Sequence, residues 1–174
     1  MGRDAPPPAN PLMPASPQGP FLGVDLGLKR TGLAVSGEGS PVASPLEILD
    51  VPRREKEERI ERIIRERAIR GAVLGWPLHM DGRPGEMASK VRRLGERIAR
   101  RSGIPVWTWD ERLSSVEVDR RAREAGRRAA PRDDLAATVI LQGFLDGQGW
   151  KRPPLFAGSG PAPAGPSDSG TDSP

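Results

Sequence analysis

Short apolar runs alternate with amphipathic stretches between residues 21 and 150, and this pattern predicts a domain of strands and helices. The runs "FLGVD" and "TGLAVS", joined by "LGLKR", predict a β-hairpin. A third strand is predicted over residues 43–49, where Pro45 restricts it to a sheet edge or a bulge. Two more short strands are predicted at "GAVLGWP" and at "IPVWTW".

Helices are predicted between and after these strands from the spacing of their apolar residues. The first has an apolar face made of Ile60, Ile63, Ile64 and Ala68. The second has an apolar face made of Met87, Val91, Leu94 and Ile98. It stops near Gly103, and a capping box of Ser114 and Glu117 opens a third helix. A last helix runs from about Asp133 through "LAATVILQGFLD", so the order of elements predicts an α/β fold, a five-stranded mixed sheet flanked by helices.

Proline is concentrated at the two ends of the chain. Seven of the 20 prolines lie in residues 1–20 and six in residues 151–174, among Ala, Gly and Ser. Such composition is typical of disordered tails because it offers little apolar surface to bury. The sequence therefore predicts one folded domain over residues 21–150 between two disordered tails.

The absence of certain features narrows the class of protein. The chain has no cysteine, which excludes disulfides and thiolate metal sites. It has no apolar run of the roughly 18 residues needed to cross a membrane, and no secretory signal at its start. These observations predict a cytoplasmic protein without a membrane partner.

The charge of the chain favours a polyanionic partner. The net charge is +4 and the sequence pI is about 10.3. Six arginines lie between positions 120 and 132, where they either hold a nucleic-acid backbone or form a solvated helix face. The candidate phosphate-binding residues are Lys29, Arg30, Arg112, Arg127, Arg128 and Arg132. Lys29 and Arg30 lie in the predicted hairpin turn, and a solvated turn is the alternative for them.

Acidic residues occupy the ends of several predicted elements. Asp25 stands in an apolar strand, where a carboxylate needs a cation or a salt-bridge partner. Asp110 and Glu111 follow the fifth strand, at the end where open α/β sheets place their sites, unless they are ordinary loop acids. Asp133 and Asp134 open the last helix, where either could simply be a helix cap. Carboxylates from separate elements suit Mg²⁺, and two such ions can activate water for phosphodiester cleavage.

Four segments in chain order span residues 23–146 and carry a family resemblance. They are "GVDLGLKRTGLAVS", "VLGWPLHMDGRPGEMA", "WDERLSSVEV" and "DDLAATVILQGFLD". Together they resemble the YqgF/RuvX family of ribonuclease-H-like nucleases, which is related to Holliday-junction resolvases. The resemblance implies a ribonuclease-H-like fold and a metal-dependent nuclease that acts on structured nucleic acid. In this family the activity is associated with maturing the 5′ end of pre-16S rRNA in ribosome biogenesis, and resolution of branched DNA in repair and recombination is the alternative.

The resemblance also implies roles for particular residues. By motif match, Asp25, Glu111 and Asp133 are the catalytic and metal-binding acids. They would hold one or two Mg²⁺ or Mn²⁺ ions, with two favoured. Asp110 belongs to the same motif, as a further ligand or as the neighbour of one. The partner is then structured RNA or branched DNA, bound by a monomer or a homodimer.

Two departures from the family pattern accompany the resemblance. Trp76 and His79 stand where the family more often has leucine and asparagine. We expect neither to touch the proposed acids, and both could alter substrate contacts along the loop after the fourth strand. The second acid also follows the fifth strand, whereas related resolvases carry theirs after the fourth, which weakens a direct transfer of junction cleavage.

Two other classes of protein fit parts of the sequence. An ATP-binding domain of the sugar-kinase and actin type shares the glycine-containing hairpin, but it needs a second domain that about 130 core residues cannot supply. A catalytically silent nucleic-acid-binding protein is the other class. Three retained acids argue against it, because carboxylates without a cation repel phosphate.

Overall fold

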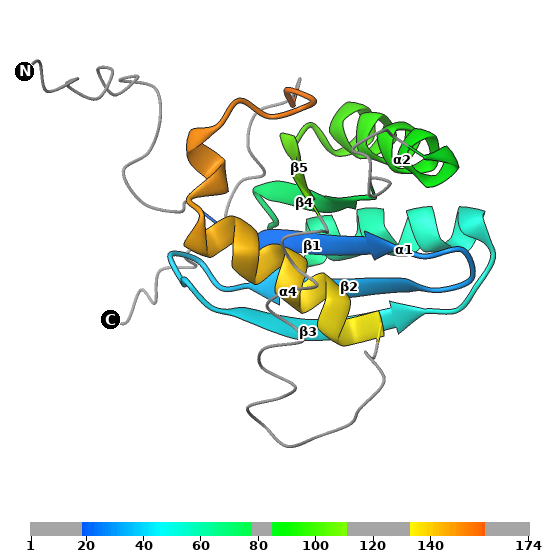
Figure 1. The fold of residues 1–174 in the computed structure, drawn as a ribbon, viewed down its shortest axis with the longest axis horizontal. Helices are drawn as coiled ribbons and strands as arrows, with labels where there is room; N and C mark the ends of the chain where they lie inside the picture. Colours follow the sequence, from blue (N-terminus) through cyan, green and yellow to red (C-terminus); the bar gives the residue numbers. More distant parts are fainter. Residues whose placement is uncertain (1–18, 78–84, 111–132, 159–174) are drawn as a thin grey trace, which may run out of the picture.

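Five strands form one mixed sheet in the computed structural model, which describes residues 19–77, 85–110 and 133–158 and leaves the side chains of Asp133 and Asp134 undescribed (Figure 1). The strands are β1 (Phe21–Leu26), β2 (Thr31–Ser36), β3 (Ala43–Leu49), β4 (Gly71–Trp76) and β5 (Val106–Asp110). Their order across the sheet is β3-β2-β1-β4-β5. β1, β2 and β3 pair antiparallel, whereas β4 pairs parallel with both β1 and β5. The predicted five-stranded mixed sheet is confirmed.

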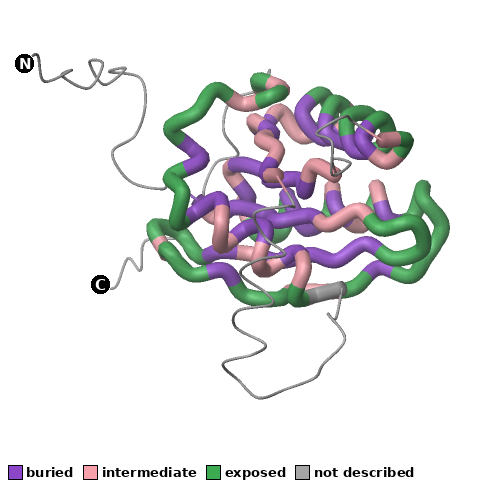
Figure 2. The backbone as a smooth tube through the Cα atoms, viewed as in Figure 1, coloured by how far each residue is buried: buried purple, intermediate pink, exposed green. Residues whose placement is uncertain are grey.

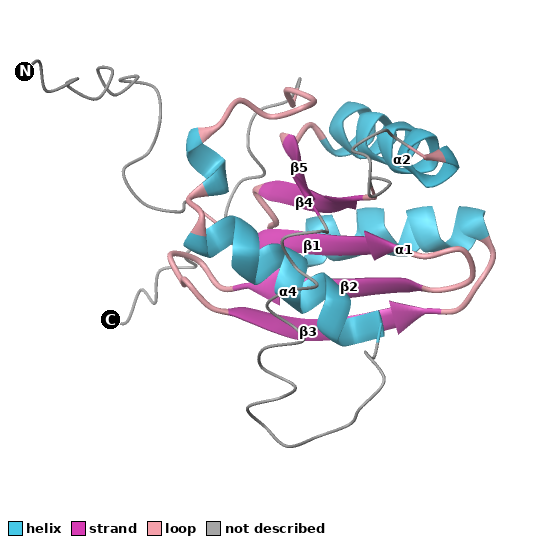
Figure 3. Cartoon of the chain, in the orientation of Figure 1, coloured by secondary structure: helices cyan, strands magenta, loops and turns pink. Residues whose placement is uncertain are grey.

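Helices cover both faces of this sheet (Figure 3). Helices α1 (Arg53–Glu66) and α2 (Glu86–Ser102) pack on one face, and α4 (Asp133–Asp146) crosses the other. The helix predicted from the capping box at Ser114 lies outside the described residues. None of the helices in the described ranges is long and apolar enough to span a bilayer.

Side chains of β1 alternate between the two apolar cores on either side of the sheet. Leu22 and Val24 belong to the core beneath α1 and α2, whereas Phe21 belongs to the core beneath α4. This alternation follows from strand geometry, which points successive side chains to opposite faces. Figure 2 shows the buried backbone running through the central strands, so the sheet is the shared wall of both cores. We call its two sides the α1–α2 face and the α4 face.

The predicted role of Pro45 is confirmed. β3 is the edge strand of the sheet, and its pairing with β2 shifts register between Leu33 and Ala34. Leu33 pairs with Glu47 and Ala34 with Pro45, so one residue of β3 is accommodated as a bulge. Glu47 accepts hydrogen bonds from Arg59 of α1, one of them at 2.8 Å. This contact raises the pKa of the Arg59 guanidinium above its usual value.

The first predicted helix extends at least two residues too far. α1 ends at Glu66, and Ala68 lies beyond it with a φ of 49°. The backbone therefore turns at Ala68, and Ile69, which the pattern did not include, is fully buried in its place. A charged pattern with apolar residues at 60, 63, 64 and 68 does not show that the chain leaves the helix before Ala68.

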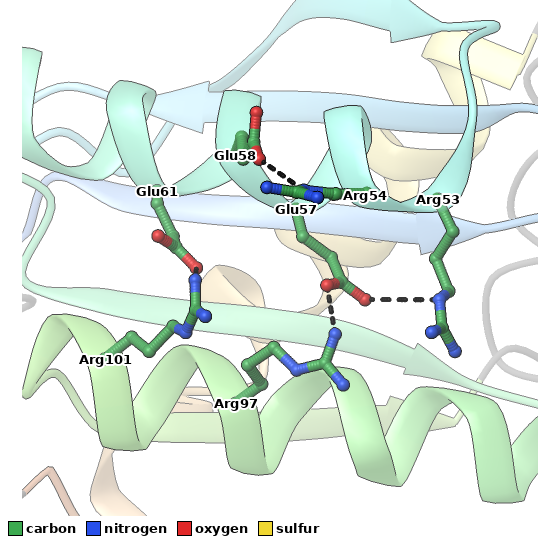
Figure 4. Close-up of polar contacts among 7 residues, drawn as sticks. All are labelled: Arg53, Arg54, Glu57, Glu58, Glu61, Arg97 and Arg101. Atoms are coloured by element: carbon green, nitrogen blue, oxygen red, sulfur yellow. Dashed lines mark hydrogen bonds and ion pairs between the residues drawn. The ribbon is translucent and has the colours of Figure 1, made fainter.

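Ion pairs join α1 to α2 on their solvent side (Figure 4). Glu57 of α1 lies between Arg53 and Arg97, and Glu61 accepts a hydrogen bond from Arg101 at 2.9 Å. Such partly exposed pairs each stabilise a protein by at most about 1 kcal/mol. Packing of Ile60, Ile63 and Ile64 against the sheet is therefore the main attachment of α1.

The chain continues to pack after α4. A 3₁₀ turn covers Gly149–Lys151, and Phe156 pairs with Val106 of β5 while packing against the α1–α2 core. Trp107 and Trp109 of β5 both pack with Phe144 of α4 and belong to the core on that side of the sheet. The domain limits of 21–150 remain a prediction.

Gly23 of β1 sets how closely α4 approaches the sheet. A Cβ atom at this position would lie 2.8 Å from the Cβ of Leu141 and 2.9 Å from the carbonyl oxygen of Ala137. We expect Gly23→Ala to lower the free energy of unfolding by about 1–3 kcal/mol, because α4 must move away. Urea denaturation of the purified variant measures this change.

Gly37→Ala is the matched control for that variant. Gly37 is exposed, and a Cβ there would come no closer than 3.4 Å to another atom, the Cβ of Ser40. The expected change is within about 0.5 kcal/mol. Equal losses in the two variants would contradict the close packing of α4 on β1.

Candidate active site

Asp25 lies near the carboxyl end of β1 and is half-buried. It pairs in register with Gly32 of β2, which has no side chain to cover it. Phe21 and the Gly23 position face α4, so alternation along the strand places Asp25 on the α4 face. The carboxylate is partly open to solvent because Asp25 lies next to the end of the strand.

α4 runs roughly antiparallel to β1 and crosses the sheet obliquely, from in front of the end of β3 toward the start of β1 (Figure 1). The rings of Phe21 and Phe144 are 5.5 Å apart, whereas Gly23 meets Ala137 and Leu141, nearer the start of the helix. From this contact, two strand residues lead to Asp25, a distance of about 6.6 Å. Four helical residues, about 6 Å, lead from Ala137 back to position 133. Along the direction of the strands, the first residue of α4 is therefore level with Asp25, on the same face of the sheet.

Asp110 is the last residue of β5 and is half-buried, so it lies within the strand rather than after it. Val106 of β5 belongs to the α1–α2 core, whereas Trp107 and Trp109 belong to the α4 core. Alternation then places Asp110 on the α1–α2 face, in register with Trp76 of β4. Asp25 and Asp110 thus lie on opposite faces, with β4 between their strands.

The β1–β2 turn holds the cations predicted to meet a phosphate. Lys29 and Arg30 are exposed, and Arg30 forms an ion pair of 3.3 Å with Asp50. The backbone carbonyl of Lys29 accepts a hydrogen bond of 2.6 Å from the Nζ of Lys56. Leu28, at the tip, is 85% exposed. The turn therefore presents two cations at the end of the sheet where Asp25 lies.

The remaining predicted site residues fall outside the described part of the chain. They are Glu111, Arg112, Arg127, Arg128 and Arg132, together with the side chain of Asp133. Within the described ranges no three acidic or histidine side chains gather in one place. The described residues therefore supply one carboxylate of the predicted three, Asp25, and the backbone position of a second, Asp133.

A cavity of about 630 Å³ lies on the α1–α2 face, where the β1–β2 turn meets α1 and α2. We call it the basic cavity. Its charged lining consists of Lys29, Arg53, Lys56, Lys90, Arg93, Arg97, Asp50 and Glu57. The sequence pattern does not predict this cavity, although Lys90, Arg93 and Arg97 follow the three- and four-residue spacing of one helix face. That signal concerns a single helix and does not show which other element faces it.

A family model described as RuvX, Holliday junction resolvase, matches residues 19–147. The chain belongs to the RuvX family. This membership confirms the predicted resemblance and makes the protein a nuclease, an enzyme that hydrolyses phosphodiester bonds. It also supports divalent-metal dependence in general.

The match to curated relatives covers nearly the whole length of each relative. One from an Anaeromyxobacter species is 43% identical over 133 residues, which is 74% of this chain and 97% of the relative. One from Agathobacter rectalis is 41% identical over 134 residues, which is 72% of this chain and 94% of the relative. Both are named "Putative pre-16S rRNA nuclease".

Solved structures support the fold. RuvC from Thermus thermophilus aligns with a TM-score of 0.53 at 20% identity, over 78% of this chain and 99% of RuvC. The same protein in complex with a Holliday junction substrate aligns with a TM-score of 0.54 at 18% identity, over 78% of this chain and 98% of that one. The ribonuclease-H-like fold implied by the sequence resemblance is confirmed.

Because Asp25 and Asp110 lie on opposite faces of the sheet, substitutions can test which acid of the "DER" segment is catalytic. We expect Asp110→Asn to keep nuclease activity within about tenfold of the native chain, because position 110 faces away from Asp25. The paired variant Glu111→Gln, one residue on, is expected to lose at least about 100-fold, equivalent to about 2.7 kcal/mol of barrier. Cleavage rates at saturating Mn²⁺ measure both, and the reverse order would assign the catalytic role to Asp110.

Proposed function

We propose that this chain is a divalent-cation-dependent nuclease whose catalytic centre consists of Asp25, Glu111 and Asp133, and whose substrate is the precursor of 16S rRNA. The observation that carries this proposal is the position of Asp25. It lies at the carboxyl end of a central strand, half-buried, level with the first residue of α4. A carboxylate in that place is open to a ligand and fixed by the sheet.

The remaining two acids fit the same place by position along the chain. Asp133 is four residues before Ala137, whose carbonyl oxygen meets Gly23, so it lies on the stripe of α4 that follows β1. Glu111 comes directly after Asp110, and a continued alternation in β5 would turn it to the α4 face. The three positions come from separate elements that end at one edge of the sheet.

The donor set has the chemistry of a hard cation site. Carboxylate oxygens are the ligands that Mg²⁺ and Mn²⁺ prefer, and the chain has no cysteine to favour a softer metal. Asp25, Glu111 and Asp133 would hold two such ions, with Asp110 on the other face of β5 as a neighbour. Bound divalent ions lower the pKa of water and neutralise charge on a phosphodiester.

Cations near this centre would hold the nucleic-acid backbone. Lys29 and Arg30 are exposed on the turn that follows Asp25. Arg112 follows Glu111, and Arg127, Arg128 and Arg132 precede Asp133 along the chain. Contacts of this kind neutralise phosphates and position a strand without reading its sequence.

The names of the relatives favour RNA over branched DNA as the substrate. Relatives that match over almost their whole length are named for pre-16S rRNA, whereas the family model is described by Holliday junctions. We therefore propose 5′-end processing of pre-16S rRNA in ribosome biogenesis, in the cytoplasm, by a monomer or homodimer. Cleavage of branched DNA is the second candidate, supported by that family description.

Asp25→Asn tests the catalytic centre. The amide keeps the size of the side chain and removes its negative charge, so cation binding weakens. We expect metal-dependent cleavage of a labelled pre-16S rRNA fragment to fall by at least about 1000-fold, or about 4 kcal/mol of barrier. EDTA should abolish cleavage by the native chain, and thermal unfolding should show that the variant is folded. Full cleavage by a folded Asp25→Asn protein would refute the proposal.

A four-way DNA junction, offered in a parallel reaction, tests the choice of substrate. Under the proposal the native chain cleaves the RNA at least about tenfold faster than the junction, a difference in barrier of about 1.4 kcal/mol. A preference for the junction by the same factor would promote the branched-DNA alternative. The proposed metal-dependent hydrolysis of phosphodiester bonds would then stand, with branched DNA in place of RNA as the substrate.

A further inference from the structure

We propose that the basic cavity binds the phosphate of a nucleotide, either a free nucleotide or one within a nucleic-acid strand. The cavity lies on the α1–α2 face of the sheet, away from the α4 face on which Asp25 stands. Where the phosphate belongs to a strand, the inference rests on the proposed nuclease function and extends the substrate path past the β1–β2 turn. Where the nucleotide is free, it stands independently of that function.

Positive charge exceeds negative charge in the lining of the basic cavity. Its described lining holds six cationic and two acidic side chains. Both acids already have partners: Glu57 lies between Arg53 and Arg97 (Figure 4), and Asp50 pairs with Arg30. Lys29, Lys56 and Arg93 form no ion pair with any described residue. The excess charge therefore faces the cavity without a matching carboxylate among the described residues.

Lys56 is the most deeply buried of these cations, at 8% exposure. Among the described residues its ammonium group donates one hydrogen bond, to the carbonyl of Lys29 at 2.6 Å. An ammonium has three donors, and a buried cation without a carboxylate is costly unless other acceptors satisfy it. Phosphate oxygens entering the basic cavity would supply both the acceptors and the opposite charge.

Thr31 supplies a second, independent observation. This first residue of β2 lines the basic cavity and is fully buried, and its Oγ1 has no hydrogen-bond partner in the described part of the chain. Buried polar groups in folded proteins almost always have a partner, so each exception points to a strained or ligand-binding place. A hydroxyl can donate to a phosphate oxygen, which would satisfy it.

The rest of the lining fits a nucleoside. Leu26, Ile60 and Leu94 belong to the apolar core and also line the basic cavity. A volume of about 630 Å³ lies within the range typical of small-molecule pockets. α1 begins here at Pro52 without a side-chain cap, so its first N–H groups add to the positive potential. Apolar surface beside clustered cations suits a ligand that carries both a base and a phosphate.

Arg93→Gln, compared with Arg92→Gln, tests the inference. Both arginines are exposed on α2, but only Arg93 lines the basic cavity. The probes are fluorescent adenosine monophosphate and a fluorescent ten-nucleotide RNA, titrated by anisotropy against the full chain in EDTA. We expect Arg93→Gln to raise the Kd of at least one probe about tenfold and Arg92→Gln to change it less than about twofold. A change for the mononucleotide identifies a free ligand, and a change for the RNA alone identifies a strand.

Thr31→Val separates ligand binding from a structural role. Valine keeps the shape of the side chain and removes the hydroxyl that lacks a partner. The unfolding midpoint of the variant should therefore equal or exceed that of the native chain, while the Kd for the responding probe rises at least about threefold. Equal affinities of the native chain, Arg93→Gln and Thr31→Val for both probes would overturn the inference. Equal weakening by Arg92→Gln and Arg93→Gln would do the same.

Cleavage of the pre-16S rRNA fragment is measured on the same preparations. If the native chain cleaves the RNA normally while Arg92→Gln and Arg93→Gln bind the probes equally well, the proposed phosphate site in the basic cavity is overturned. The nuclease proposal then stands. Absence of cleavage together with the expected binding difference overturns the nuclease proposal and leaves a nucleotide site.

Discussion

The contact between α4 and β1 at Gly23 is the constraint on which the proposed active site depends. Only a hydrogen fits between the strand and the helix there, with Leu141 and the backbone of Ala137 on the other side. This contact fixes the position of α4 along β1, and it also fixes the distance between the helix and the strand. Because the helix runs antiparallel to β1, its first residue falls level with Asp25. A packing requirement in the core thus sets how far along the strand the start of α4 lies.

Strand alternation separates Asp110 of the "WDER" segment from Asp25. Asp110 shares the α1–α2 face with Val106, whereas Asp25 lies on the α4 face. Adjacent acids in one motif therefore need not act together. The sequence alone left open whether Asp110 is a ligand, because motif matching does not record the face on which a residue lies. The sheet register supplies that information.

Much of the fold could be predicted from periodicity, because each strand and most helices carry their own local pattern. The hairpin, the edge position of Pro45 and the end of α2 at Gly103 all follow from residues close together in sequence. The error at Ala68 has a local cause too: a left-handed residue ended the helix without a glycine to mark it. The basic cavity could not be predicted, since it needs α1, α2 and the β1–β2 turn to meet. Each of them alone has the charges of an ordinary solvated surface.

The β1–β2 turn connects two regions of opposite charge at one end of the sheet. On one side Asp25 is half-buried, and on the other Lys56 is almost fully buried beneath the carbonyl of Lys29. A carboxylate that binds cations attracts phosphate only when those cations are present, whereas the basic cavity attracts phosphate at any metal concentration. Binding and cleavage are therefore separable in this fold. If a strand spans both faces, its affinity is set mainly by the lysines and arginines of α1 and α2, and the metal decides whether the bound strand is cut.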